Sequence, residues 1–338
     1  MMKNFDIVIV GAGPVGLFTV FEAGLVNLKC ALVDSLSQPG GQCIELYPEK
    51  PIYDIPGVPY QTARQHVNAL MDQIKPFEPE FFLNTDVKFV ERHELGNYTL
   101  QLSNGETLMT RNIFMASGPG KFIPRRPDVH GLAEAEADNM VEYAVKNVEE
   151  IIGDDVIIFG GGDSAIDWAL ELQHKCRLTL IHRSEKFKAV PANIEAVKNS
   201  NLIRTFFGYK PEKIDGNNVT IKSKVERMVL KADKVFMFFG LLTDVNLVQG
   251  LPEDIYDSNK RIPVDTEYFQ SSTPGIFAIG DCNDYPGKLK LILSGFHETT
   301  LAVQEAYKRI HKSDPEFMYT TTSTVLREKL SRKHDNNN

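Results

Sequence analysis

Two glycine-rich turns, each set between an apolar run and a helical stretch, constrain the fold of this chain most strongly. The first is Gly11-Ala12-Gly13-Pro14-Val15-Gly16. It follows residues 5–10, a β-branched run typical of a buried parallel strand, and precedes a helical stretch from Leu17 to about Val26. In such a turn Gly11 permits the tight bend, Gly13 lets the backbone approach a pyrophosphate, and Gly16 lets helix and strand pack closely. Pro14 lies between them.

An acidic residue completes this first pattern. A second apolar run, residues 29–33, ends in Asp34, which stands 23 residues after Gly11. A carboxylate there can accept hydrogen bonds from an adenosine ribose, while the helix N-terminus faces the phosphate charge. A purely structural glycine turn is the alternative. The strand, helix, second strand and acid in register favour a dinucleotide-binding unit.

The same pattern recurs in the middle of the chain. Residues 155–159 form an apolar run, Gly160-Gly161-Gly162-Asp163-Ser164-Ala165 forms the turn, and residues 166–172 continue as a helix. Alanine in the third small position is an accepted variant. The sequence therefore predicts a second dinucleotide site, with Gly160, Gly162, Asp163 and Ser164 at its turn.

The second unit ends in basic residues where the first has an acid. After the apolar run 177–181 come His182 and Arg183, followed by Lys186 and Lys188. A carboxylate would repel a 2′-phosphate, whereas a guanidinium can bind one in bidentate fashion. The pattern favours NADP over NAD, with a solvated basic turn as the alternative. Two different dinucleotides in one chain indicate hydride transfer between them, and FAD fits the acid-ended site because a bound flavin can also pass single electrons.

Composition restricts the partners and the compartment. The 338 residues carry a formal net charge of −8, which gives no general attraction for nucleic acid or an anionic membrane. The apolar start, residues 5–21, contains Asp6 and the glycine turn, so we expect a strand and a helix rather than a membrane segment. Four scattered cysteines form no C-x-x-C pair and no metal-ligand spacing, which predicts a cytoplasmic protein without a metal site.

Further segments carry a family resemblance. Gly41-Gln42-Cys43 running into Leu46-Tyr47-Pro48-Glu49-Lys50, the segment 161–169, the late segment 275–281 and the segment 287–292 resemble the thioredoxin-reductase-like ferredoxin (or flavodoxin)–NADP reductases. The resemblance extends to about Thr324. It implies an α/β protein with two Rossmann-like domains, one for FAD and one for NADP, in a three-layer, thioredoxin-reductase-like fold.

The resemblance also implies roles for residues at the flavin. Asp34 would hold the adenosine ribose, and the other positions would contact the rest of FAD: Gln42 on the flavin side, Tyr47 stacked on the ring system, Val87 at the adenine through its backbone, Phe122 against the rings, and Asp281 at the ribityl chain. A C-terminal aromatic would cover the other face of the flavin. Tyr319 is the candidate for this cover, with Thr320 or Thr321 bonding nearby; a tail tyrosine packed on the surface is the alternative.

One departure from the family pattern concerns the phosphate-binding turn. Relatives commonly show His-Arg-Arg and a later arginine, and this chain has Ser184 and Lys188 at the last two positions. Serine still donates a hydrogen bond and lysine still supplies charge, but the bidentate geometry is weaker. NADPH remains the expected nucleotide.

The resemblance predicts a split organisation. Residues 1–115 and 246–312 would form the FAD-binding domain, 116–245 an inserted NADP-binding domain, and 313–338 a flavin-covering segment with a disordered end.

The resulting hypothesis is electron transfer between NADPH and ferredoxin or flavodoxin, by hydride transfer to the flavin and one-electron steps to the carrier. The cofactors would carry the chemistry, so no side chain is assigned a catalytic role. The resemblance implies a homodimer. Acidic carriers would need a basic patch, for which the candidates are Lys121, Arg125, Arg126, Lys288 and Lys290.

The leading alternative is an NADPH-dependent disulfide reductase of thioredoxin type, which needs a redox cysteine pair near the second turn; residues 119–159 contain no cysteine. A flavin monooxygenase, another flavin reductase or a dinucleotide sensor are further alternatives.

Overall fold

The computed structural model describes residues 2–244 and 248–315, and the chain divides into two compact units. Unit 1 comprises Met1–Lys121 and Asp244–Asn338, and unit 2 comprises Phe122–Thr243. The division therefore lies at 121/122 and 243/244, compared with 115/116 and 245/246 from the sequence. The two crossing segments, β9 (Lys121–Pro124) and β18 (Leu241–Asp244), pair with each other in a two-stranded sheet.

Unit 1 is built on a seven-stranded sheet. Its strands run in the order β5 (Glu80–Phe82), β2 (Cys30–Val33), β1 (Lys3–Val10), β8 (Thr107–Met115), β7 (Tyr98–Leu102) and β6 (Val87–Arg92), with β20 (Ile276–Ala278) also paired to β8. The β5, β2, β1, β8 and β20 pairings are parallel, whereas β6, β7 and β8 form an antiparallel meander. β8 is long enough to pair with β7 through its first half and with β20 through its second.

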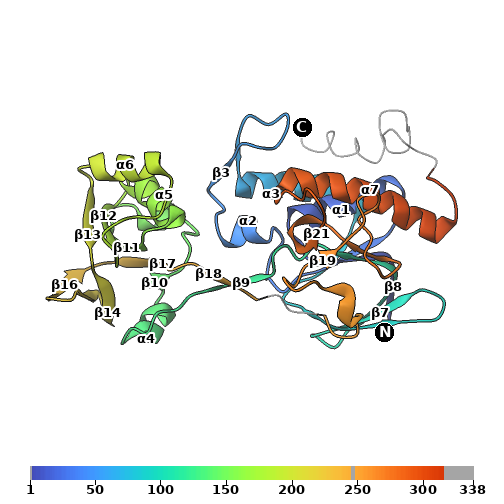
Figure 1. Cartoon of the computed structure of the whole chain (residues 1–338), viewed down its shortest axis with the longest axis horizontal. Helices are drawn as coiled ribbons and strands as arrows, with labels where there is room; N and C mark the ends of the chain where they lie inside the picture. The colour runs from blue at the N-terminus through green and yellow to red at the C-terminus, as the bar shows by residue number, and fades with distance from the viewer. Residues whose placement is uncertain (1, 245–247, 316–338) are drawn as a thin grey trace, which may run out of the picture. The chain divides into compact units, whose positions relative to one another are not determined.

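Helices cover one face of this sheet. α1 (Pro14–Leu25) packs against α3 (Ala63–Ile74) and α7 (Ile292–His311), as Figure 1 shows. β1 is buried on both faces: Ile7 and Ile9 belong to the core under these helices, and Val8 belongs to the core on the opposite face. This two-sided burial explains why the second half of the strand, residues 7–10, is apolar throughout instead of alternating.

The smaller elements of unit 1 lie in the connections between these strands and helices. They are α2 (Gln42–Glu45), β3 (Pro51–Ile52), β4 (Gln61–Thr62), η1 (Lys75–Phe77), η3 (Glu253–Ile255), β19 (Ile262–Pro263), η4 (Gly280–Cys282) and β21 (Asn283–Asp284). α3 begins with a capping box, in which Thr62 and Gln65 satisfy each other's backbone amides.

Unit 2 has a five-stranded, all-parallel sheet in the order β10 (Val141–Glu142), β17 (Lys234–Phe238), β11 (Asp155–Gly160), β12 (Arg177–His182) and β13 (Ile203–Phe207). α5 (Asp163–Leu172) and α6 (Pro191–Asn199) contact each other and share one apolar core with one face of this sheet. The other face packs against the antiparallel sheet β14 (Lys210–Asp215), β15 (Asn218–Lys222) and β16 (Arg227–Lys231), together with α4 (Leu132–Ala137). The short η2 (Glu149–Ile151) precedes β11.

Both units thus contain a parallel strand, a glycine turn and a helix in the predicted order. β1 begins two residues before the predicted strand, and both helices begin three residues before the predicted starts, at Pro14 and Asp163. The observed helices start earlier than the predicted ones because Gly13 and Gly162 are their N-cap residues, so each helix begins inside its glycine motif.

Candidate functional site

The candidate site of unit 1 lies where parallel strands end. The carboxyl ends of β1, β2, β8 and β20 lead directly into Gly11, Asp34, Ala116 and Ile279. Backbone hydrogen bonds tie these ends together: Ala116 N donates to Val10 O at 2.8 Å, and Ile279 N donates to Met115 O at 2.9 Å. Ligands of open α/β sheets bind at this edge.

The first glycine turn has the close contacts that its residue types predict. Gly11 has a φ of +114°, and a Cβ there would lie 2.4 Å from Ala116 O. A Cβ on Gly16 would lie 2.0 Å from Gly11 O, so any side chain at this position would keep α1 from packing closely on the end of β1. Gly13 differs, because the nearest atom to its Cβ position is Gly41 Cα at 4.0 Å. This bare stretch of backbone is where a pyrophosphate would fit.

The start of α1 leaves amide donors for such a group. Gly13 is the N-cap and offers no side-chain cap, and Pro14 occupies the first turn. The amides of the first helical turn have no partner within a helix, and the helix dipole adds positive potential there. Residues 11–16 therefore fit a dinucleotide phosphate.

Asp34 lies beside this turn. Its Oδ2 accepts from Ala12 N at 2.6 Å, and its Oδ1 accepts from Leu36 N at 2.9 Å. Burial raises the pKa of Asp34 above its usual range, and these two amides oppose the rise. Each carboxylate oxygen can accept a second hydrogen bond, so the side chain retains capacity for ribose hydroxyls.

Val87 is the first residue of β6 and lies near the segment that follows Asp34. Thr85 N donates to Asp34 O at 2.9 Å, and Asn84 N donates to Leu36 O at 2.9 Å. The pairing of β6 with β7 is irregular between Val87 and Phe89. Val87 therefore lies two residues after a backbone hydrogen bond to Asp34, and its contact with adenine remains a prediction.

Gln42 and Tyr47 lie at either end of α2, and both are half-buried. Gln42 Nε2 is 3.2 Å from the Cβ position of Gly118, which brings α2 close to the end of β8. Tyr47 packs on the helix-side core. Its pKa is raised by burial, with further contributions from neighbouring Cys43 and from the Asp281 carboxylate. The structure thus gathers Tyr47 and Asp281 in one region.

Asp281 lies in η4, directly after β20, and is half-buried. Burial raises its pKa, while Lys288, Lys290 and Arg261 lower it. The Arg261 guanidinium donates to the Asp281 carbonyl oxygen. The turn contacts the start of α1, since a Cβ on Gly280 would lie 3.4 Å from Val15 Cγ2.

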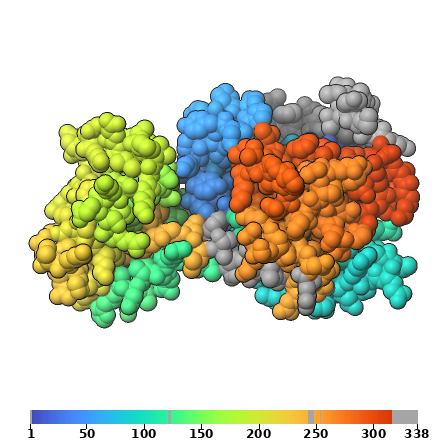
Figure 2. Space-filling model, viewed as in Figure 1, coloured from blue at the N-terminus to red at the C-terminus, as the bar shows by residue number. Residues whose placement is uncertain are grey.

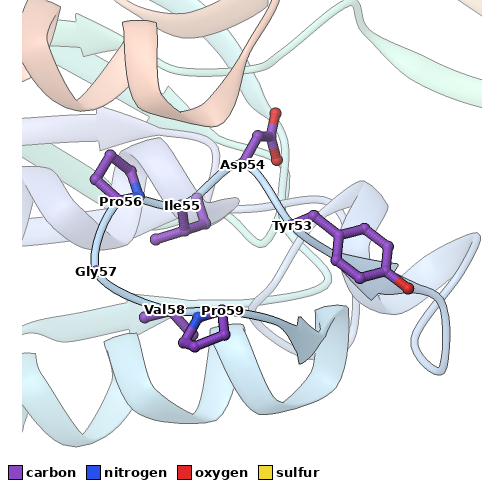
Figure 3. Close-up of a pocket in the computed structure, with 7 residues that line it drawn as sticks. All are labelled: Tyr53, Asp54, Ile55, Pro56, Gly57, Val58 and Pro59. Atoms are coloured by element: carbon purple, nitrogen blue, oxygen red, sulfur yellow. The ribbon is translucent and has the colours of Figure 1, made fainter.

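The loop after β3 encloses a hollow in unit 1. Tyr53, Asp54, Ile55, Pro56, Gly57, Val58 and Pro59 line it, and Figure 3 shows the Tyr53 ring pointing away from the loop. All seven belong to one continuous segment. The hollow therefore lacks the convergence of several strand ends that the glycine-turn site has.

The candidate site of unit 2 lies at the second glycine turn. A Cβ on Gly160 would lie 2.7 Å from Ala165 Cβ, and one on Gly161 would lie 2.3 Å from His182 Nδ1. Gly162 is exposed, with only Lys188 O, at 3.9 Å, near its Cβ position. The N-terminus of α5 has no side-chain cap, as in α1.

Two of the predicted nucleotide ligands support the turn itself. The His182 ring lies against Gly161, and its Nε2 is 3.1 Å from Lys186 O; burial lowers the pKa of His182. Asp163 Oδ1 accepts from Val190 N at 2.9 Å. Direct contact of His182 and Asp163 with a nucleotide remains a prediction, as do the nucleotide contacts of the other residues at this turn.

The remaining predicted ligands are accessible. Ser164, Arg183 and Lys188 are exposed at the end of the sheet. The backbone of Lys188 is tied to the glycine turn, because its N donates to Gly161 O at 2.7 Å. Lys188 is thus held beside the second glycine turn, and both Arg183 and Lys188 are exposed to solvent.

Several positions fall outside the described part. Phe122 belongs to β9, but its side chain is not described. Tyr319, Thr320 and Thr321 lie beyond residue 315 and so outside the described residues. The proposed aromatic cover remains a prediction.

One candidate for the basic patch is wrong. The Lys288 side chain is only 6% exposed and pairs with the fully buried Glu298, so it cannot present charge to a carrier. Arg126 is exposed but pairs with Glu136. Glu298 is not among the residues predicted from the sequence. Its signal is its place in the apolar stripe of α7, among the buried residues Gly295, Thr299, Ala302 and Val303.

No group of acidic, histidine or cysteine side chains with metal-binding geometry occurs in residues 2–244 and 248–315. Within the same residues, no helix is long and apolar enough to cross a membrane.

Two sets of parallel strands, each followed by a glycine turn at the carboxyl ends of the strands, are the arrangement of an oxidoreductase with two dinucleotide sites. The model of the family described as Pyridine nucleotide-disulphide oxidoreductase matches residues 5–308, and the chain belongs to that family. FAD and a nicotinamide dinucleotide are the cofactors that this family implies.

Two relatives align with almost the whole chain. The sequence is 42% identical over 336 residues to "Ferredoxin--NADP reductase" of Mesorhizobium japonicum, covering 96% of this chain and 97% of the relative. It is 44% identical over 345 residues to the protein of the same name from Polaromonas naphthalenivorans, covering 96% and 92%.

Solved structures show the same fold. A thioredoxin reductase from T. acidophilum matches with a TM-score of 0.70 and 21% identity, covering 90% of this chain and 98% of that chain. One from Lactococcus lactis matches at 0.68 and 24%, covering 91% and 100%. The predicted thioredoxin-reductase-like α/β fold is confirmed.

Proposed function

We propose that the protein is a ferredoxin–NADP reductase that transfers electrons between NADPH and ferredoxin or flavodoxin. The observation that carries this proposal is the 42–44% identity to proteins of that name over 96% of the chain. The exposed arginine beside the second glycine turn supports NADPH, and the bare Gly13 backbone beside Asp34 supports FAD.

FAD would lie along the carboxyl edge of the unit 1 sheet. Gly13 and the amides at the start of α1 would bind its pyrophosphate, Asp34 the adenosine ribose, and Asp281 the ribityl hydroxyls. Gln42, Tyr47 and Phe122 would contact the flavin, Val87 the adenine, and Tyr319, Thr320 and Thr321 the opposite face of the flavin. NADPH would use Gly162 and Ser164 for its pyrophosphate and Arg183 with Lys188 for its 2′-phosphate.

The chemistry that a bound flavin supplies is the acceptance of a hydride and the release of single electrons. The chain contributes binding and orientation. Tyr47 offers a half-buried aromatic face that would exclude water, and Asp281 would accept hydrogen bonds from hydroxyl groups at the strand end. No side chain is needed as an acid or base for this transfer, so we assign no catalytic residue.

The four cysteines weigh against a disulfide reductase. Cys30, Cys43, Cys176 and Cys282 are all free and buried. Burial raises the pKa of Cys43 and of Cys282 to about 11, so neither supplies a thiolate at neutral pH. Buried free thiols also support a cytoplasmic location. We further infer a homodimer, as the family resemblance implies.

Stopped-flow mixing tests the proposal. The enzyme, reduced with NADPH without oxygen, is mixed in turn with ferredoxin, flavodoxin, oxidised thioredoxin and a quinone, and flavin reoxidation is followed by absorbance. Ferredoxin or flavodoxin should reoxidise the flavin at least about tenfold faster than thioredoxin, since direct electron transfer requires no thiol. Reoxidation by thioredoxin alone would refute the proposal.

A further inference from the structure

Glu298 is an ionisable residue in an unusual setting. It lies on α7, a helix whose outer side is visible at the surface of unit 1 in Figure 2, but its own side chain is fully buried. A buried carboxylate is costly unless hydrogen bonds and an opposite charge compensate it. The groups around Glu298 must therefore compensate the cost of burying its carboxylate.

Four donors converge on this carboxylate. Oε2 accepts from Gly280 N at 2.7 Å and from Asn283 Nδ2 at 2.9 Å. Oε1 accepts from Tyr285 OH at 2.8 Å and from the Lys288 ammonium. Both oxygens are thus occupied by two donors each, and Lys288 supplies the counter-charge in a buried ion pair.

The two donors on Oε2 flank Asp281. Gly280 precedes it in the turn and has a φ of +73°, while Asn283 follows it two residues later. Asn283 Nδ2 also donates to Ala278 O at 2.9 Å, at the end of β20. One carboxylate oxygen therefore fixes both sides of the turn that presents Asp281.

We propose that Glu298 is the positioning residue for Asp281, holding it in place to bind the ribityl hydroxyls of FAD, with Tyr285 and Lys288 fixing the Glu298 carboxylate. This inference rests on the proposed assignment of Asp281 to the FAD site. Glu298 itself need not touch the cofactor, because it acts through the backbone of the turn.

Only a carboxylate satisfies this arrangement. Glutamine has the same size, but its amide nitrogen would face either Gly280 N with Asn283 Nδ2 or the Lys288 ammonium, and each of these is a donor. Glu298→Gln should therefore either lose the two bonds to the turn or place its amide donors against the Lys288 ammonium, and in both orientations Lys288 loses its counter-charge and the turn is held less firmly.

A double-mutant cycle on FAD binding tests the proposal. FAD is removed from wild type, Glu298→Gln, Asp281→Asn and the double variant, and the Kd for added FAD is measured by quenching of flavin fluorescence. Glu298→Gln should raise the Kd about ten- to hundredfold in the wild-type background and less than about threefold in the Asp281→Asn background. Glu305→Gln, the same substitution on the same helix, is the matched control and should leave the Kd unchanged.

Equal losses in both backgrounds would show that Glu298 supports unit 1 generally, and would overturn the proposal. An unchanged Kd for Asp281→Asn would overturn the FAD assignment of Asp281 and this inference with it, while ferredoxin reduction tests the overall function separately. If Glu298→Gln does not fold, Tyr285→Phe removes a single donor from Oε1. It should raise the Kd about threefold, and again only where Asp281 is present.

Discussion

Two glutamates in unit 1, the fully buried Glu298 and the half-buried Glu22, have opposite settings. Glu298 has four donors, whereas Glu22, on α1, has no hydrogen-bond or ion-pair partner among residues 2–244 and 248–315. Burial alone raises the pKa of Glu22 to about 7. The same residue type is therefore a connecting group in one helix and a source of instability in another.

Glu22 should make stability pH-dependent. Its folded pKa of about 7 lies above the ordinary value of 4.5, so between these values the folded state holds a proton that the unfolded state has lost. Stability due to this group therefore falls as pH rises through the window. Glu22→Gln cannot titrate, and relative to wild type it should gain about 1–3 kcal/mol in unfolding free energy between pH 5 and pH 8. Urea unfolding of both proteins at the two pH values measures this; a constant difference would contradict it.

At the scale of elements, the connection from β12 to α6 acts as one unit. His182 packs under Gly161, and the Lys188 amide bonds to Gly161 O, so the basic segment and the glycine turn hold each other in place. Arg183 projects from this support into solvent. Its position depends on the whole connection and not on the arginine alone.

Arg183→Ala should affect the two nicotinamide nucleotides unequally. The lost charge-assisted contact with a 2′-phosphate is worth about 1.5–3 kcal/mol, so the KM for NADPH should rise about ten- to hundredfold. The KM for NADH should change less than about twofold, because NADH lacks this phosphate. Lys198→Ala, which removes an exposed cation on α6, is the control. Equal losses for NADPH and NADH would exclude the 2′-phosphate assignment.

The elements that the sequence predicts best are those with local causes. Gly11, Gly16 and Asp34 mark the first unit within 30 residues, because the tight turn and the close packing admit few alternatives. The roles of Glu298 and Lys288 could not be derived in this way. Nothing in residue type distinguishes a charged side chain in solvent from one buried in an ion pair, and only the packing of α7 on the Gly280 turn decides it.

At the scale of the whole molecule, the four thiols belong to separate parts of the core. Cys30 and Cys43 pack in the helix-side core of unit 1, Cys282 in the core on the other face, and Cys176 in unit 2. This distribution indicates a packing role for the thiols.

A variant without cysteines should therefore remain an electron-transfer enzyme. We would change Cys30 and Cys176 to alanine and Cys43 and Cys282 to serine. The FAD-loaded variant should reduce cytochrome c through ferredoxin at no less than about half the wild-type rate. Its free energy of unfolding should be lower by a few kcal/mol, because the core is less well filled. A folded, FAD-loaded variant with almost no turnover would show that a thiol carries electrons.

The pairing of β9 with β18 has a consequence for how such a chain can be rearranged. Neighbouring strands lie about 4.8 Å apart, so the chain leaves unit 1 and returns to it at nearly the same point. The whole of unit 2 is therefore an insertion between two paired strands. A module inserted in this way can be excised by joining two adjacent backbone ends, so recombination can exchange unit 2 as a single piece.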